Sequence, residues 1–141
     1  MGDYDSVRKS SSPDFKSRGE VQIARLLDRQ GIRYLYELPL AVSDRGKVRI
    51  WYPDFQLPEY GIIMEYFGAM GKGSYDDQVK HKMEVYGQMG LEGVFLKEPC
   101  FQGDWPGRIL SQIEGILQNR LSRFQLRSDR RDCNRQHRRS Q

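Results

Sequence analysis

Cysteine and long apolar runs are both scarce in this chain of 141 residues. Cys100 and Cys133 are too few and too far apart to form a disulfide framework or a zinc site by themselves. No apolar run approaches the roughly 18 residues that a membrane span needs, and the N-terminus lacks the hydrophobic region of a signal peptide. We therefore expect a soluble, cytoplasmic protein with reduced thiols and no membrane partner.

A phosphate-binding P-loop is also missing, although the segment 68–74 is rich in glycine. Such a loop needs four residues between its first glycine and a Gly-Lys-Ser/Thr triplet, whereas here Gly73 follows Lys72. The segment is better interpreted as a flexible connection to the next helix. P-loop nucleotide chemistry is thereby excluded.

Negative charge is scarce at the C-terminal end. Residues 119–141 contain eight arginines against Asp129 and Asp132, so they carry a net charge of +6 within a chain of net charge +4. The end of the chain, 127–141, has almost nothing to bury and is predicted to be disordered. Arginine-rich segments of this kind bind nucleic-acid phosphates and release the counterions of the nucleic acid, although a merely solubilising tail has the same composition. We expect a flexible leader over 1–16, one domain over 17–126 and a basic tail.

The domain itself shows an alternation of helical and strand patterns. A capping box, Ser17-x-x-Glu20, predicts a helix that ends at Gly31. Strand patterns follow over 32–38, over 47–57 after a polar turn, from Ile62 onward, and over 93–97. A helix from Tyr75 to Gly90 is expected to turn an apolar stripe inward, and a last helix begins near Ile109. The order helix, three strands, helix, strand, helix predicts a mixed α/β sheet flanked by helices. The stripe consists of Tyr75, Val79, Met83 and Tyr86.

The segment 52–68 predicts a β-hairpin that brings two carboxylates together. If its turn is centred between Glu59 and Tyr60, residues whose numbers sum to 119 face each other, and Asp54 lies opposite Glu65. Like charges at such positions, with Cβ atoms about 4.5–5.5 Å apart, destabilise a sheet. A hard divalent cation such as Mg²⁺ would turn this repulsion into coordination. A solvated polar face would equally leave both carboxylates in water.

Three more polar residues, Glu20, Glu37 and Lys82, are candidates for the same region. Glu20 either caps its own helix or points from the first turn at whatever the helix packs on. Glu37 is interpreted as a charge at a strand edge or as a group that supports the ligands. At 100° per residue Lys82 lies about 60° from Val79, closer to the inward stripe than Lys80. His81 points away from the stripe and is interpreted as a surface residue.

These residues carry a family resemblance over about 17–118. The chain resembles the PD-(D/E)xK nuclease superfamily, especially small phage and mobile-element endonucleases, junction-resolving enzymes among them, and the nuclease domains of some helicases. The resemblance implies a restriction-endonuclease-like core. It implies that Asp54 and Glu65 bind Mg²⁺, that Glu20 helps to hold it, and that the backbone carbonyl of Tyr66 is a further ligand. It is carried by Ser17-x-x-Glu20, Gly31-Ile32-x-Tyr34-x-Tyr36-Glu37, Tyr52-Pro53-Asp54-Phe55-x-Leu57-Pro58 and Gly61-Ile62-x-x-Glu65-x-x-Gly68.

One residue of the superfamily pattern is missing. The lysine that usually stands two residues after the second acid is replaced by Phe67. Some members resemble this chain in carrying the lysine on the following helix, in a pattern like Tyr75-x6-Lys82-x3-Tyr86. The helical geometry favours Lys82 independently, so we expect a lysine that has moved.

The resemblance implies a function. We expect a Mg²⁺-dependent DNA endonuclease in which a metal-activated water attacks the phosphodiester, with Mn²⁺ able to substitute and Lys82 orienting the water. The alternative is a catalytically inactive nuclease fold that binds nucleic acid or joins a DNA-processing assembly. DNA is the expected partner, in a bacterial or phage setting, and a homodimer is expected if both strands of a duplex are cut.

Overall fold

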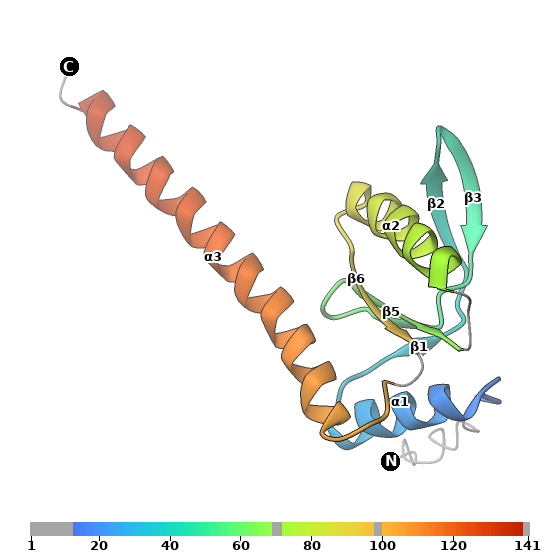
Figure 1. The fold of residues 1–141 in the computed structure, drawn as a ribbon. Coiled ribbons are helices and arrows are strands. Elements are labelled where there is room, and N and C mark those ends of the chain that lie inside the picture. The colour runs from blue at the N-terminus through green and yellow to red at the C-terminus, as the bar shows by residue number, and fades with distance from the viewer. Residues whose placement is uncertain (1–12, 69–71, 98–99, 140–141) are drawn as a thin grey trace, which may run out of the picture.

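A computed structural model describes residues 13–68, 72–97 and 100–139, and its centre is a four-stranded sheet (Figure 1). Its strands lie in the order β1, β4, β5, β6, in which β5 and β6 are parallel and the other pairs antiparallel. This arrangement confirms a mixed sheet with flanking helices. The strands are β1 (Leu35–Tyr36), β4 (Phe55–Leu57), β5 (Ile62–Phe67) and β6 (Glu92–Lys97).

Two further strands correct the predicted order of elements. β2 (Leu40–Asp44) and β3 (Lys47–Trp51) form a separate hairpin, so five strands precede the second helix. Arg45 and Gly46 at its tip both have positive φ, 51° and 75°, as a two-residue hairpin turn requires. The long strand predicted over 47–57 is interrupted around Pro53, because proline has no N–H to offer a ladder.

The register of the β4–β5 hairpin is the one predicted. Phe55 pairs with Met64, and Leu57 with Ile62, so the partner numbers sum to 119. The next pair in this register is Asp54 and Glu65, directly beyond the last paired position. The sequence therefore placed these two carboxylates side by side at the end of the hairpin.

Helix α1 (Arg18–Arg29) covers one face of the sheet. The Ser17 hydroxyl accepts from the Glu20 N–H and the Glu20 carboxylate accepts from the Ser17 N–H, so the predicted capping box is present. Ile23, Ala24 and Leu27 are buried in the main core. There they pack with Phe55, Leu57, Ile62, Met64, Val94, Leu96 and, from the last helix, Ile109 and Ile113.

Helix α2 (Lys72–Gln88) and the β2–β3 hairpin lie at the opposite face of the sheet (Figure 1). Val85 and Tyr86 are buried there against Ile63 and Val42. The predicted inward stripe was wrong at Met83, which is 55% exposed. The prediction was right for Tyr86, and Val85 beside it is buried as well, because this side of the helix packs on Ile63 and Val42. With both faces covered, β5 is buried along most of its length.

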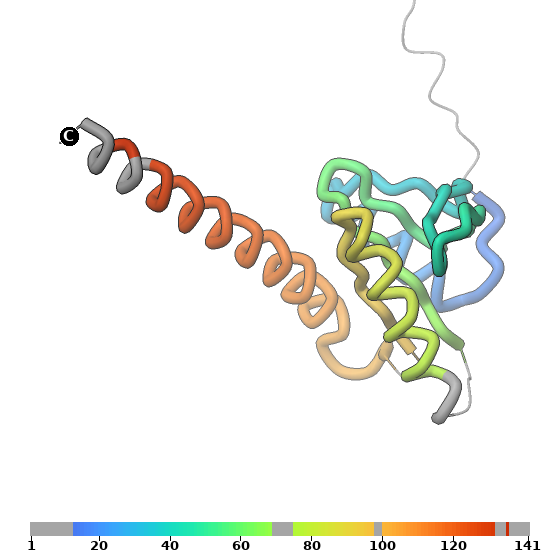
Figure 2. The backbone as a smooth tube through the Cα atoms, turned by 90° about the horizontal axis from the view of Figure 1, so that it is seen from above, coloured from blue at the N-terminus to red at the C-terminus, as the bar shows by residue number. Residues whose placement is uncertain are grey.

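Helix α3 (Trp105–Arg139) contacts the rest of the protein along its first half, as far as Arg123, and then extends away from it (Figures 1 and 2). Ile109 and Ile113 are buried, whereas Leu121 and Phe124 are exposed. The broad apolar face predicted for this helix therefore does not become core along its whole length. The segment predicted to be disordered is helical through Arg139, since its arginines and glutamines favour a helix that an earlier turn has nucleated.

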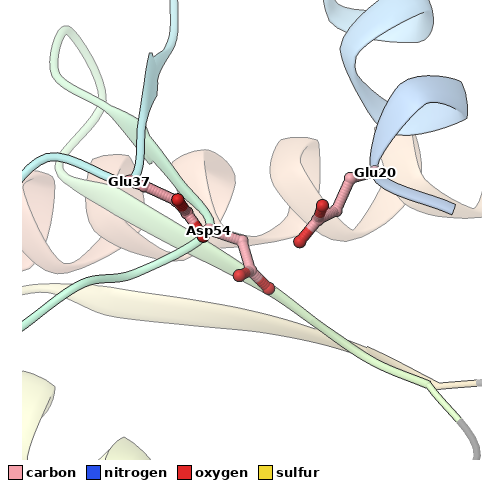
Figure 3. A group of neighbouring side chains, drawn as sticks. All are labelled: Glu20, Glu37 and Asp54. Atoms are coloured by element: carbon pink, nitrogen blue, oxygen red, sulfur yellow. The ribbon is translucent and has the colours of Figure 1, made fainter. Parts of the chain in front are cut away.

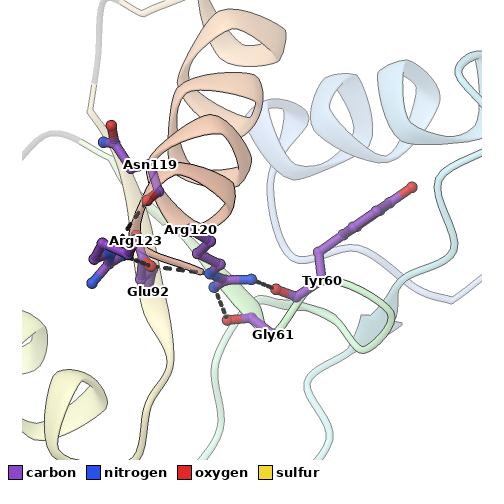
Figure 4. A network of polar contacts seen from close by, with 6 residues as sticks. All are labelled: Tyr60, Gly61, Glu92, Asn119, Arg120 and Arg123. Atoms are coloured by element: carbon purple, nitrogen blue, oxygen red, sulfur yellow. Dashed lines mark hydrogen bonds and ion pairs between the residues drawn. The ribbon is translucent and has the colours of Figure 1, made fainter. Parts of the chain in front are cut away.

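Two arginines fasten α3 to the sheet (Figure 4). The guanidinium of Arg120 donates to the carbonyls of Tyr60 and Gly61 in the turn of the β4–β5 hairpin and to the Glu92 carboxylate. Arg123 Nη2 lies 3.1 Å from the same carboxylate. Arg120 and Arg123, counted in the sequence with the basic tail, thus anchor the helix.

Residues 1–12 of the predicted leader lie outside the described part of the chain, but its end is packed. The ring of Phe15 contacts that of Tyr36 edge-on, with centroids 4.8 Å apart. Lys16 Nζ lies 2.6 Å from Glu37 Oε1, and its backbone N–H donates to Glu20. The prediction of a flexible segment without chemistry was wrong for these last residues, since they join the site.

Candidate functional site

Glu20 is held in place by its own helix and by the sheet. Its Oε2 accepts from the backbone N–H groups of Lys16 and Ser17 and, at 2.9 Å, from the hydroxyl of Tyr36 on β1. Burial and the hydrogen bond to Glu20 raise the pKa of Tyr36 to about 12. Both interpretations of Glu20 therefore hold: it caps α1 and faces the end of the sheet. No hydrogen bond from the described residues reaches its Oε1.

Asp54 lies just before β4, in the middle of this acidic region. Its Oδ2 accepts from the backbone N–H of Tyr66 at 2.7 Å, which fixes the carboxylate against β5. Burial raises the pKa of Asp54 to about 6, and the charges of Glu20 and Glu65 act in the same direction. The Tyr66 N–H and the Lys82 ammonium oppose this shift. Negative charge therefore exceeds positive charge around Asp54.

Glu37 joins this cluster, which the sequence did not show. Ligand oxygens of Glu20, Glu37 and Asp54 lie within 4.8 Å of one another, as Figure 3 shows. β1 pairs with β4, and the Glu37 N–H donates to the Asp54 carbonyl at 3.1 Å, so the two residues are neighbours across the strands. Glu37 has a positive φ of 48°, uncommon for a residue with a side chain. The sequence did not show that β1 pairs with β4, and this pairing is what brings Glu37 to Asp54.

Glu65 lies on β5 beside this cluster and has its own partners. It is only 5% exposed. Its Oε1 accepts from the hydroxyl of Tyr86 at 2.6 Å, and its Oε2 forms an ion pair with the ammonium of Lys82. Burial and the charge of Glu65 raise the pKa of Tyr86. Glu65 thus lies at the position that the predicted register gave it. Its carboxylate contacts two side chains of α2, Lys82 and Tyr86.

Lys82 reaches the sheet from α2, on the side that its helical position indicated. Besides Glu65, its ammonium lies 5.4 Å from the ring centroid of Phe67 and 5.8 Å from that of Trp51. Lys80 on the same helix is exposed. The ammonium therefore lies next to Phe67, the position at which the resemblance would place a lysine.

Tyr66 contacts Asp54 through its backbone N–H, a contact that the sequence did not indicate, and its carbonyl as a metal ligand stays a prediction. Its ring packs against the first turn of α1: a Cβ at Gly19 would lie 2.4 Å from Cε1 and Cζ of Tyr66. Only glycine at position 19 allows this approach, which brings the turn that holds Glu20 to Asp54.

Gly19→Ala is expected to destabilise the protein by about 1–3 kcal/mol, because the Tyr66 ring must move and overpacking costs more than the gain in helix propensity. The measurement is thermal or urea unfolding. Gly115→Ala on α3 is the matched control, since a Cβ there meets nothing within 4 Å. It should stabilise slightly, and equal behaviour of the two variants would contradict the close packing of Gly19.

A cavity opens beside Lys82, between β3 and α2. It has a volume of about 440 Å³. His81 at its wall lies 3.1 Å from Asp44 Oδ1 and packs edge-on against Trp51, so it is not the free surface residue that we expected. The lining residues are Ile50, Trp51, Tyr52, Glu65, Gln78, His81 and Lys82.

Comparison with known proteins adds no assignment. The chain matches no model of a known protein family, and it matches no curated protein. Within the described residues, no helix is both long and apolar enough to cross a membrane.

The cluster of Glu20, Glu37 and Asp54 fits a hard divalent cation. The three side chains offer only oxygen ligands, which Mg²⁺ prefers. The Lys16 ammonium on Glu37 offsets only part of their mutual repulsion, and this remainder, together with the burial of Asp54, favours a further positive ion at this point. Glu65 belongs to a different group, because both of its oxygens contact residues of α2.

The raised pKa of Asp54 predicts a pH dependence of stability. Because the folded-state pKa, about 6, exceeds the ordinary 3.8, protonated Asp54 stabilises the fold below pH 3.8, and this contribution is lost as the pH rises through 6. In a partly solvated site the loss should be about 1–2 kcal/mol for the metal-free protein. Urea unfolding of wild type and Asp54→Asn across this range isolates it. A difference between the two that does not change with pH would contradict the shift.

Proposed function

We propose that the protein is a metal-dependent nuclease that hydrolyses phosphodiester bonds in DNA, with Mg²⁺ as its ion. The observation that carries this proposal is the position of the Lys82 ammonium. It lies on Glu65 and next to Phe67, within the region where the PD-(D/E)xK pattern calls for a lysine. A restriction-endonuclease-like core is part of the same proposal, supported by a mixed sheet whose hairpin carries both acids.

The residues divide into two groups. Asp54, Glu20 and Glu37 would hold the cation through carboxylate oxygens. When bound, a hard divalent cation supplies positive charge to the phosphate and makes a water more acidic. Glu65 is then a positioning residue: one of its oxygens holds the Lys82 ammonium and the other accepts from Tyr86.

The chemistry assigned to Lys82 is electrostatic. Its ammonium orients the attacking water and stabilises charge that develops on the phosphate oxygens. The water oxygen bonds to phosphorus, the bond from phosphorus to the leaving sugar oxygen breaks, and that oxygen takes up a proton. The cavity of about 440 Å³ beside Lys82 leaves space for the nucleotide that carries the phosphate. The residues of this mechanism include no covalent nucleophile.

The proposal is tested by incubating the protein with linear, nicked and four-way DNA in the presence of Mg²⁺ or Mn²⁺, with EDTA as control. Cleavage that requires the cation is the expected result. DNA that is retarded on a gel but stays intact under all conditions would instead establish the inactive binding protein.

A further inference from the structure

The outer face of α1 forms a second, basic surface. Arg18, Gln22, Arg25 and Arg29 succeed one another at intervals of three or four residues, so they share one face of the helix. Together with Val21 and Trp105 they line a hollow of about 390 Å³. At 100° per residue Glu20 lies about 200° from Arg18, so this surface is separate from the acidic cluster.

The charges of this surface are not held in ion pairs on the described part of the chain, although Asp14 and Asp28 line a neighbouring hollow together with Arg25. Arg18, Arg25 and Arg29 are exposed, and none of them forms an ion pair with a described residue. Arg29 Nε donates only to the Arg25 carbonyl. Like charges four residues apart on a helix destabilise it. An anionic ligand would remove this repulsion, and the planar guanidinium suits phosphate oxygens.

Trp105 adds an aromatic side to the hollow. It is the first residue of α3, half-buried, and its indole meets the ring of Phe101 edge-on, with centroids 4.9 Å apart. An indole beside guanidinium groups is the combination that binds single-stranded nucleic acid, since a base stacks on the ring while the arginines take the phosphates. A paired base inside a duplex cannot reach such a ring.

We propose that this surface binds a single-stranded segment of nucleic acid, with Arg18, Arg25 and Arg29 on phosphates and an unpaired base on Trp105. The choice of DNA as the nucleic acid rests on the proposed function, whereas the surface itself does not depend on the metal site. A substrate with an unpaired segment beside the cleaved bond would engage both. The proposal thus narrows the substrate class to single-stranded or branched DNA.

The test uses Trp51→Phe in the full-length protein, which leaves Trp105 as the only tryptophan. An oligothymidylate of about 12 nucleotides, titrated in EDTA, should quench its fluorescence. Arg25→Gln/Arg29→Gln should weaken binding about tenfold and reduce the slope of affinity against salt by about one. Arg45→Gln/Lys47→Gln, which removes the same charge from the exposed β2–β3 turn, should have little effect. Asp54→Asn should bind as well as wild type.

Three results would overturn the proposal. If the two double variants weakened oligonucleotide binding equally, the binding would depend on the overall charge of the protein and not on this surface. Trp105 fluorescence that does not change at saturating oligonucleotide would show that no base stacks on the indole. Competition by polyglutamate as strong as that of the oligonucleotide would point to an acidic protein as ligand. Binding through this surface in a protein that cuts no DNA would support the site and remove only the proposed hydrolysis.

Discussion

Lys82→Ala is expected to lower the rate of Mg²⁺-dependent DNA cleavage by about 10²–10³-fold, with little loss of DNA affinity. The reason is that in the proposed mechanism its ammonium, which lies on Glu65 beside the acidic cluster, acts mainly on charge that develops in the transition state. Single-turnover cleavage measures the rate, and binding in EDTA measures the affinity. Lys80→Ala is the matched control: it removes the same charge from the exposed side of the same helix and should change little.

A rescue experiment sharpens this prediction. Phe67→Lys in the Lys82→Ala background places a lysine at the position where the resemblance would put it. Because the Lys82 ammonium lies 5.4 Å from the Phe67 ring, the new side chain enters the space that the first substitution vacates. Partial recovery of cleavage is expected, with melting temperatures confirming that both variants fold. Full activity in Lys82→Ala, or a larger effect of Lys80→Ala, would refute the assignment of Lys82.

Asp54→Asn and Glu65→Gln are both expected to abolish cleavage, but with opposite effects on the metal-free protein. Asp54→Asn removes a partly buried charge surrounded by acids and keeps an acceptor for the Tyr66 N–H. It should stabilise the fold by about 1 kcal/mol at neutral pH. Glu65→Gln leaves the Lys82 ammonium without its counter-charge, so it should destabilise by about 1–2 kcal/mol. Urea unfolding in EDTA measures both.

Cation affinity separates the two roles. Titration with Mg²⁺, followed by calorimetry, should lose its signal in Asp54→Asn and keep it in Glu65→Gln, because only Asp54 belongs to the oxygen cluster with Glu20 and Glu37. Asp28→Asn, an exposed acid on α1, is the matched control and should alter neither property. Loss of Mg²⁺ binding in Glu65→Gln would make Glu65 a ligand, as the resemblance implied. Wild-type cleavage in Asp54→Asn would remove the site altogether.

Local patterns in the sequence were sufficient for a large part of the site. The Ser17–Glu20 capping box and the register of the hairpin depend on residues close together in the chain, and both are present as predicted. The angle of Lys82 on its helix likewise follows from helical geometry alone. These interactions are short-range, so the residue types at fixed spacing determine them.

The tertiary structure decided what depends on contacts between distant elements. Glu37 reaches Asp54 only because β1 pairs with β4. The rotation of α2 that buries Val85 and exposes Met83 follows from what the helix packs on, and an apolar stripe that placed only Tyr86 correctly could not show it. Residues that are far apart in the sequence but in contact in the fold leave no local pattern in the sequence. The energy that selects them comes from burial and charge pairing in the assembled fold.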